Sequence, residues 1–596
     1  MSDGQDIEID VEALERKYAE ERDKRLRTDA FEQFHELAGD YAGFDRDPNA
    51  DPDFKRDPIV EECDVVTIGG GFGALLVAGR LREKGLGKIR IIEKGADVGG
   101  TWYWNRYPGA ACDVESYIYM PMLEEVGTMP TEKYAKAPEI FAHSQKIARH
   151  YDLYADALFQ TVVEAARWDG KRQRWIVSTS RGDEIATRYL ISCTGLLSNP
   201  KMPGIPGIDS FKGHSFHTSR WDYTYTGGNQ NGELTGLKDK RVGIIGTGST
   251  GIQCIPHLGN WAKQLYVFQR TPSSIDPRGN APTDPEWVKT LKPGWAKERM
   301  RNFTSLTSGG REEVDLVQDG WTDIIADVSS PTGGTEPVDE AAVKYAQMRK
   351  MELTRRRIEE AVDDPETAEA LKPWFHYFCK RPCFHDEYLQ TFNKPNVKLV
   401  DTKGRGVERV TPKGVVVDGT EYELDLLIFA TGFDFIVEYS RESGVELYGI
   451  GGRKLSDHWA EGRRTLHGLQ THGFPNFFVI GPTQAGVAVN YCHSVDDQSS
   501  HIAYIIGEAV KRGIGAIQPT HEAEEKWIES ILASAGARRA FLASCTPGYL
   551  NYEGKWGRQF ALNDFYGAGP TAYMGMLADW RDEGSLVGLE EVPAVA

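Results

Sequence analysis

The stretch FKGHSFHTSRWD, residues 211–222, gathers two histidines, an arginine and a Trp-Asp pair between two glycine-rich segments. Such groups could bind a metal, pack as a linker or belong to a catalytic site. His214 and His217 are only three residues apart, and no set of cysteine or carboxylate ligands completes a metal site around them. We therefore expect no metal here, and the role of the stretch depends on the segments that flank it.

The first flanking segment, residues 63–94, reads CDVVTIGGGFGALLVAGRLREKGLGKIRIIEK and predicts a strand, a tight turn, a helix and a second strand. The residues of this turn that we expect to bind a cofactor are Gly69, Gly71, Gly73 and Ala74, three of which match the G-x-G-x-x-G/A pattern. The glycines let the backbone approach a pyrophosphate at the helix N-terminus, and Glu93 is placed to bond a ribose hydroxyl. A dinucleotide with a free 2′-hydroxyl, such as FAD, fits this unit.

The second flanking segment, residues 240–271, reads KRVGIIGTGSTGIQCIPHLGNWAKQLYVFQRT and repeats the strand–turn–helix–strand order. Its turn contains the complete fingerprint and two hydroxyl residues: Gly246, Gly248, Ser249, Thr250 and Gly251. The second strand ends on Arg270 and Thr271, where the first unit has an acid. Because an arginine attracts a ribose 2′-phosphate and a carboxylate repels it, this unit is predicted to bind NADP.

A third block, GGTWYWNRYPGAACD at residues 99–113, directly follows the first unit. It contains three consecutive aromatic residues, an arginine, a Pro-Gly turn and an acid. A buried structural loop could use the same residues for packing.

Bulk properties describe an ordinary globular chain of 596 residues with a formal net charge of −19, which argues against a nucleic-acid binder. We predict no membrane span and no signal peptide, because no apolar run is long enough and the first residues, MSDGQDIEID, lack basic and apolar regions. The eight cysteines are scattered, so we expect free thiols in a reducing compartment and a cytoplasmic protein. The sequence leaves the oligomeric state open between monomer and dimer.

The motifs together predict an α/β protein with two Rossmann-like dinucleotide-binding domains, a helical insertion and an N-terminal helical extension. The expected layout is an extension at 1–58, an FAD domain at 59–200 and 426–596, an NADP domain at 201–274 and 378–425, and the insertion at 275–377. Residues 1–58 show no chemistry of their own, and we interpret them as a strap on the main body.

Two dinucleotide folds that flank F-x-G-x-x-x-H-x-x-x-W-D resemble the Baeyer–Villiger monooxygenases, the class B flavoprotein monooxygenases. The matching positions are Phe211, Gly213, His217, Trp221 and Asp222. The block at 99–113, the ATGFD at 430–434 and the Lys380-Arg381 pair resemble further motifs of that family. The resemblance of the block implies that Gly100, Thr101, Trp102 and Asp113 contact a cofactor. The resemblance implies that NADPH reduces a bound FAD, that a C4a-peroxyflavin forms with O2, and that a ketone becomes an ester or lactone.

The resemblance also implies roles for single residues. Arg381 would supply the fixed positive charge of the reaction, with Asp113 as its carboxylate partner. Lys380, with Arg270 and Thr271, would bind the 2′-phosphate, and His217 would act in coupling domain motion to turnover. Some family members have a tryptophan where SCTPGYLNYEGK here shows Gly548 and Tyr549, and this departure favours large cyclic or polycyclic ketones.

Three other hypotheses remain. Two of them are enzymes with the same two-dinucleotide architecture, and the third is a nucleotide-binding protein with little catalysis. A flavin N- or S-oxygenase would use the same peroxyflavin on amines or thioethers, and Trp221-Asp222 argues against it. A pyridine-nucleotide disulfide reductase needs a cysteine pair beside the flavin, but Cys112 stands alone in its region. A nucleotide-binding redox sensor would turn over only slowly, and ketone-dependent NADPH consumption would exclude it.

Overall fold

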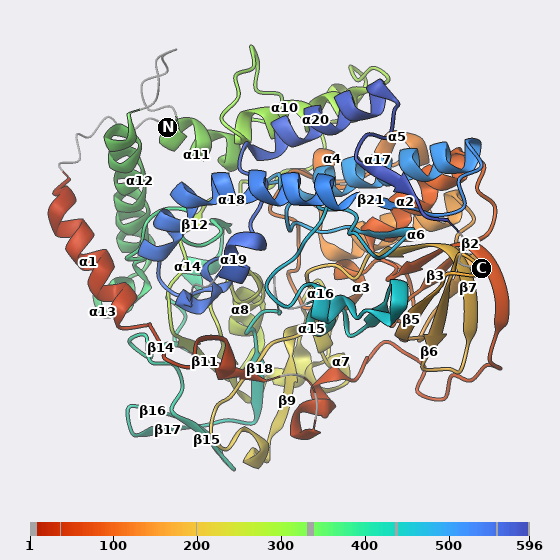
Figure 1. Ribbon diagram of the computed structural model, residues 1–596. Helices are drawn as coiled ribbons and strands as arrows, with labels where there is room; N and C mark the ends of the chain where they lie inside the picture. The colour runs from red at the N-terminus through yellow and green to blue at the C-terminus, as the bar shows by residue number, and fades with distance from the viewer. Residues whose placement is uncertain are drawn as a thin grey trace.

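Two sheets with parallel strands at their centres organise the computed structural model (Figure 1). The structure describes residues 9–35, 37, 39–197, 199–329, 339–434, 439–555 and 558–593, so the first eight residues of the predicted extension lie outside it. Within the described part, no helix is both long enough and apolar enough to cross a membrane.

The first sheet has the strand order β19-β5-β6-β7-β2-β3-β4, and β20 pairs with β7. Its strands are β2 (Val60–Ile68), β3 (Ile89–Ile92), β4 (Ala157–Leu158), β5 (Val163–Asp169), β6 (Arg174–Thr179), β7 (Glu184–Ser192), β19 (Glu446–Tyr448) and β20 (Phe477–Val479). Strands β2, β3, β4 and β7 are parallel, while β6 runs antiparallel to both of its neighbours. The inner half of β2 is buried on both faces, which suits its apolar run.

The second sheet is parallel throughout, in the order β14-β11-β10-β18-β9. Its strands are β9 (His214–His217), β10 (Arg241–Ile245), β11 (Gln264–Gln269), β14 (Val397–Asp401) and β18 (Leu426–Phe429). The expected layout assigned residues from 426 onward to the first domain, but β18 pairs with β10 and β9, so that boundary is wrong by at least this strand. A short apolar strand is equally suited to either buried parallel sheet, so its own sequence does not say which sheet it joins.

Long helices cover these sheets. They are α2 (Phe72–Glu83), α6 (Ala137–His150), α8 (Ser249–Trp261), α17 (Tyr491–Lys511), α18 (His521–Ser544) and α20 (Gly569–Glu583). Shorter helices are α3 (Thr101–Trp104), α4 (Ser116–Tyr119), α5 (Leu123–Val126), α7 (Tyr223–Thr226), α14 (Tyr388–Thr391), α15 (Tyr439–Ser443), α16 (Leu455–His458) and α19 (Arg558–Leu562). Smaller sheets pair β1 (Phe34–His35) with β8 (Met202–Pro203), β12 (Ile275–Asp276) with β13 (Cys383–Phe384), β15 (Arg409–Thr411) with β16 (Gly414–Val417) and β17 (Thr420–Glu423), and β21 (Ile517–Pro519) with β22 (Leu589–Glu591).

Residues 275–377 contain α9 (Pro285–Val288), α10 (Trp295–Thr307), α11 (Gly320–Ser329), α12 (Glu340–Ala361) and α13 (Pro365–Leu371). The N-terminal helix α1 (Val11–Asp23) packs against α12 at the left edge of Figure 1. Arg355 donates a hydrogen bond from Nη1 to the Tyr18 hydroxyl at 3.3 Å, and both side chains are buried. Further along the extension, β1 pairs with β8, which fixes a second part of the strap to the body.

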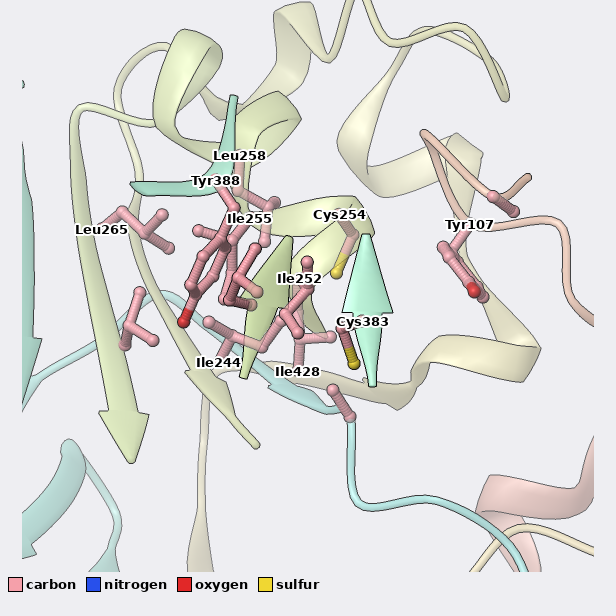
Figure 2. Packing of buried hydrophobic residues seen from close by; sticks show 14 of the residues in the cluster. Tyr107, Ile244, Ile252, Cys254, Ile255, Leu258, Leu265, Cys383, Tyr388 and Ile428 are labelled. Atoms are coloured by element: carbon pink, nitrogen blue, oxygen red, sulfur yellow. The ribbon is translucent and has the colours of Figure 1, made fainter. Parts of the chain in front are cut away.

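The core of the second unit lies between its sheet and α8. Figure 2 shows Ile252, Ile255 and Leu258 of α8 packed on Ile244 of β10 and Ile428 of β18. Each of these side chains is essentially fully buried, and burying one aliphatic side chain of this size contributes roughly 1.5–3 kcal/mol. This packing holds the turn between β10 and α8 in place.

Candidate active site

A cavity of about 1460 Å³ runs between the two nucleotide units, and both glycine turns line it. The predicted site residues that line it are Gly69, Gly71, Gly73, Glu93, Gly100, Thr101, Trp102, Asp113, Gly246, Gly248, Ser249, Thr250, Arg270, Thr271, Lys380 and Arg381. Ala74, Gly251 and His217 do not line it. The structure thus brings together residues that are separated by more than 300 positions in the chain.

The first glycine turn has the shape of a dinucleotide cradle. Gly69 has φ +104°, and a Cβ there would stand 2.5 Å from the Cys193 carbonyl oxygen, so only glycine fits. Gly71 ends the turn at the N-terminus of α2. A Cβ on Gly100 would stand 2.7 Å from the Cα of Gly71. Backbone packed this closely leaves room for a phosphate against the helix N-terminus.

Glu93, immediately after β3, closes the far side of this cradle. Its carboxylate accepts hydrogen bonds from the backbone N–H of Gly70 at 2.6 Å and of Gly95 at 2.7 Å. Burial raises the pKa of Glu93, and the two backbone N–H groups act in the opposite direction. A carboxylate fixed at the end of β3, facing the cavity, fits the ribose hydroxyl of FAD. Ala74 is fully buried in the first turn of α2, where it packs in the core and does not line the cavity.

The second glycine turn repeats this geometry. Gly246 has φ +114°, and a Cβ there would overlap the Ala430 carbonyl oxygen of the ATGFD segment. A Cβ on Gly251 would meet the carbonyl oxygen of Gly246, which explains the third glycine although it does not line the cavity. The turn therefore fits a second dinucleotide, with Ser249 and Thr250 at the start of α8.

Arg381 and Asp113 form a bidentate ion pair in the cavity wall. Nε of Arg381 donates to Oδ2 of Asp113 at 2.8 Å, and Nη2 donates to Oδ1 at 3.0 Å. The guanidinium lies over the Trp321 ring, 4.7 Å from its centroid, and the Trp321 indole N–H donates to the Asp113 carbonyl at 2.8 Å. The side chains of Arg381 and Asp113 remain 35% and 25% exposed, so the pair is accessible from the cavity.

Each residue of this pair favours the charged form of the other. Burial by itself would raise the pKa of Asp113, but the charge and hydrogen bonds of Arg381 outweigh it and lower that pKa. Burial opposes the charge on Arg381 as well, and Asp113 more than compensates, which raises the pKa of the guanidinium. The site therefore presents a permanent cation held in one orientation.

Arg270, Thr271 and Lys380 converge beside the second glycine turn. Lys380 Nζ donates to the Pro547 carbonyl at 3.1 Å, and burial lowers the pKa of its ammonium to about 8. Arg270 donates to Oε1 of Gln33 at 2.8 Å, while the Thr271 hydroxyl accepts from Arg25 at 3.1 Å. The three predicted residues therefore share a place with two residues of the N-terminal extension.

Five further residues at this place were not predicted from the motifs. Lys201 and Glu553 line the cavity there. So do Gln33, Phe34 and Arg27, which belong to the extension for which we predicted no chemistry. None of them belongs to a recognisable pattern, because the chain brings them together from three distant segments. The burial of a charged residue in a loop would have identified them, but burial cannot be read from the sequence.

The histidines of the opening stretch have separate surroundings. His217, at the end of β9, is fully buried, its Nδ1 lies 2.8 Å from the Ser219 hydroxyl oxygen, and burial lowers its pKa to about 3. Its ring packs edge-on against Phe433 of the ATGFD segment. His214 instead pairs with Asp222, with 3.0 Å between Nε2 and Oδ2. Neither belongs to a group of metal-ligating side chains in the described part of the chain.

The expectation of free thiols throughout is wrong for two cysteines. Cys379 and Cys545 form a disulfide with 5.2 Å between their Cα atoms, and the remaining six cysteines are free and buried. The two are 166 residues apart, so spacing gave no hint of the pairing. The bridge ties the segment of Lys380 and Arg381 to the loop that contains Glu553, and it removes the support that free thiols lent to a reducing compartment.

Comparison with known proteins places this geometry in a family. Residues 63–283 match the pyridine nucleotide-disulphide oxidoreductase family model, which covers the first unit and much of the second. Pentalenolactone D synthase of Streptomyces arenae is 52% identical, with 98% of this chain and 100% of that protein covered. Baeyer-Villiger monooxygenase ATR8 of Stachybotrys chlorohalonatus is 48% identical, with 98% and 95% covered.

Among solved structures, the polycyclic ketone monooxygenase of Thermothelomyces thermophila superimposes with a TM-score of 0.92 at 39% identity, covering 98% of this chain and 99% of that one. Solved relatives include complexes with FAD and NADP. Relatives that match along almost their whole length include a Baeyer-Villiger monooxygenase and a polycyclic ketone monooxygenase, so neither the disulfide reductase nor the N- or S-oxygenase alternative gains support from them. The two dinucleotide cradles, the Arg381–Asp113 pair between them and this end-to-end similarity show that the chain belongs to the Baeyer–Villiger monooxygenases, enzymes that use FAD and NADPH.

Proposed function

We propose that the enzyme converts large cyclic or polycyclic ketones into lactones, and that Arg381 and Asp113 form its catalytic centre. The observation that carries the proposal is the bidentate Arg381–Asp113 pair, which faces a cavity shared by both dinucleotide cradles. Relatives named for pentalenolactone synthesis and for polycyclic ketones support the substrate class.

The first glycine turn and Glu93 would hold FAD, which would supply the activation of O2 with electrons from NADPH. The chain's own contribution is charge and orientation. Arg381 uses Nε and Nη2 for Asp113, and its Nη1 has no partner among the described residues. This nitrogen can donate to a ketone oxygen as negative charge develops on it, and a preorganised donor of this kind contributes about 3–4 kcal/mol to transition-state stabilisation.

Apolar side chains around the pair provide the substrate space. Trp321, which covers Arg381, belongs to a cluster against which Phe378, Val489 and Leu550 pack, and all of them line the cavity. These walls exclude water and leave the guanidinium as the dominant charge. A bulky polycycle therefore fits better beside Arg381 than a small polar ketone does.

NADPH binds along the second glycine turn, with its 2′-phosphate at Arg270, Thr271 and Lys380. The support is that these three side chains converge at the carboxyl end of β11, where the fold recognises a ribose. His217 lies outside the cavity, and we infer that it acts on the orientation of the two units through Phe433, not on substrate. We also expect a cytoplasmic protein that is a monomer or a dimer.

The test is a panel of ketones of increasing ring size, supplied to the purified flavoprotein with NADPH and O2. We expect products heavier by one oxygen atom, with kcat/KM highest for fused-ring ketones. Amines and thioethers in the same panel give little product. Oxygenation confined to cyclohexanone-sized or acyclic substrates would contradict the substrate class, and oxygenation of thioethers alone would contradict the catalytic proposal.

A further inference from the structure

The place assigned to the coenzyme's 2′-phosphate already contains an anion, the carboxylate of Glu553. Its Oε1 lies 3.5 Å from Nζ of Lys201, and its Oε2 lies 3.4 Å from Nη2 of Arg270. The side chain is 2% exposed, yet Glu553, Lys201 and Arg270 all line the main cavity. Burying a carboxylate costs free energy unless cations pair with it, so packing alone does not explain a glutamate in this position.

The contacts of Glu553 are loose. Charge-assisted hydrogen bonds between N–H and carboxylate groups are typically about 2.7–2.9 Å long, and those of Glu553 are longer. Burial by itself raises its pKa, but the positive charges of Lys201, Arg270 and Lys380 outweigh burial and lower the pKa. One carboxylate therefore faces three cations, which leaves uncompensated positive charge in the cluster. A phosphate monoester, with a charge of about −1.5 to −2 at neutral pH, matches that cluster better.

The backbone places the carboxylate there at a conformational cost. Glu553 and its neighbour Tyr552 have φ of +54° and +53°, the left-handed region that residues with side chains rarely adopt. They belong to the turn Tyr549–Gly554, which follows the Cys379–Cys545 disulfide. The bridge keeps the start of this loop beside Lys380, so only the few residues after Cys545 need to move for Glu553 to leave.

We propose that Glu553 occupies the site of the 2′-phosphate in the free enzyme and must be displaced when NADPH binds, which makes it a determinant of coenzyme specificity. This inference rests on the proposed phosphate site at Arg270, Thr271 and Lys380. Two anions in one buried cluster repel each other, so phosphate entry and carboxylate departure are coupled. NADH has only a hydroxyl at this position and leaves Glu553 in place as a hydrogen-bond acceptor.

The test compares ligands that differ by the 2′-phosphate alone. Isothermal titration of the flavin-loaded enzyme with 2′,5′-ADP and with 5′-ADP measures its affinity for that group without any turnover. For Glu553→Gln we expect 2′,5′-ADP to bind about tenfold more tightly, equivalent to about 1.4 kcal/mol, with 5′-ADP unchanged. The matched control is Glu32→Gln, a highly exposed glutamate that makes a 3.9 Å contact with Lys555.

If Glu553 instead holds the cations in place for the phosphate, Glu553→Gln weakens 2′,5′-ADP, and either that result or no change overturns the inference. The proposed phosphate site itself is tested by Arg270→Ala. If that variant binds 2′,5′-ADP as the unmodified enzyme does, the site is misassigned and the inference falls with it. If Arg270→Ala weakens binding while Glu553→Gln does not tighten it, only the inference fails.

Thermal unfolding gives a second, independent measurement. Removing the carboxylate that pairs with both Lys201 and Arg270 lowers the melting temperature of Glu553→Gln in phosphate-free buffer. Inorganic phosphate then raises the melting temperature of Glu553→Gln more than that of the unmodified enzyme, because it fills the vacated place. An equal effect of phosphate on both proteins would overturn the displacement model.

Discussion

Two of the arginine–carboxylate pairs that line the cavity differ in their geometry. Arg381 and Asp113 form two short parallel hydrogen bonds under an indole ring, whereas Arg270 and Glu553 make a single 3.4 Å contact that Lys201 shares. The first geometry suits a cation that must keep its orientation through every turnover. The second suits a cation that exchanges one anion for another during each cycle.

The adjacent residues Lys380 and Arg381 belong to the two different clusters. Arg381 pairs with Asp113 of the first unit, and Lys380 is attracted by Glu553 beside the second. One dipeptide therefore contributes a side chain to each of the two clusters. Mutation of each pair should therefore affect a different kinetic constant.

Loss of the fixed cation has the largest expected effect. We predict that Arg381→Ala lowers the rate of ester formation about a hundred- to a thousandfold, because a preorganised donor to the ketone oxygen is removed. The rate of FAD reduction by NADPH, measured by anaerobic stopped-flow absorbance, should change little. Arg301→Ala, which removes a 63% exposed arginine of α10, is the control. Retained oxygenation by Arg381→Ala would remove the distinction between the pairs.

Asp113→Asn should have the next largest effect. The amide accepts from only one of the two guanidinium nitrogens, so Arg381 loses its fixed orientation, and a misplacement of about 1 Å costs about a hundredfold in rate. We expect kcat for ketone oxidation to fall while the KM for NADPH stays constant. A variant with full kcat and a raised KM for NADPH would show that Asp113 belongs functionally to the coenzyme site instead.

Arg270→Ala tests the loose pair. A charged hydrogen-bond partner of a phosphate contributes about 1.5–3 kcal/mol, so we predict that the KM for NADPH rises about ten- to a hundredfold. The kcat at saturating NADPH and the KM for NADH should remain near their original values. Steady-state kinetics with both coenzymes measure this difference. An equal rise of both KM values would contradict a role at the 2′-phosphate.

The smallest predicted effect concerns pH. The pKa of Lys380 is about 8 in the coenzyme-free structure, lowered by burial and raised again in part by Glu553. A bound phosphate favours the charged ammonium, so NADPH binds best below pH 8 and loses affinity as pH rises through it. We expect a KM for NADPH that increases a few-fold between pH 7 and 9, with no such change for NADH. Lys380→Arg, which stays charged, should abolish this pH dependence.

The two glycine units show how much could be predicted from local sequence. Their turns require glycine because carbonyl groups of other strands pass within contact distance, and the fingerprints at Gly69 and Gly246 report this requirement directly. The charge at the end of each second strand, Glu93 against Arg270, is the basis for proposing a different coenzyme at each unit. The boundary at residue 426 failed because the apolar strand β18 fits either parallel sheet.

The sequence by itself determined the two dinucleotide folds and the reaction family, because these depend on short motifs whose physics is local. It is also the basis for our proposal that FAD binds the first fold and NADP the second. The family resemblance implied that Arg381 pairs with Asp113, and the tertiary structure showed the bidentate geometry of that pair across 268 positions. Only the tertiary structure decided that Cys379 pairs with Cys545 and that Glu553 lies among Lys201, Arg270 and Lys380. Long-range pairings of single charged or sulfur-containing side chains leave no periodic pattern in a chain. Their energies arise from burial and from partners that folding brings together.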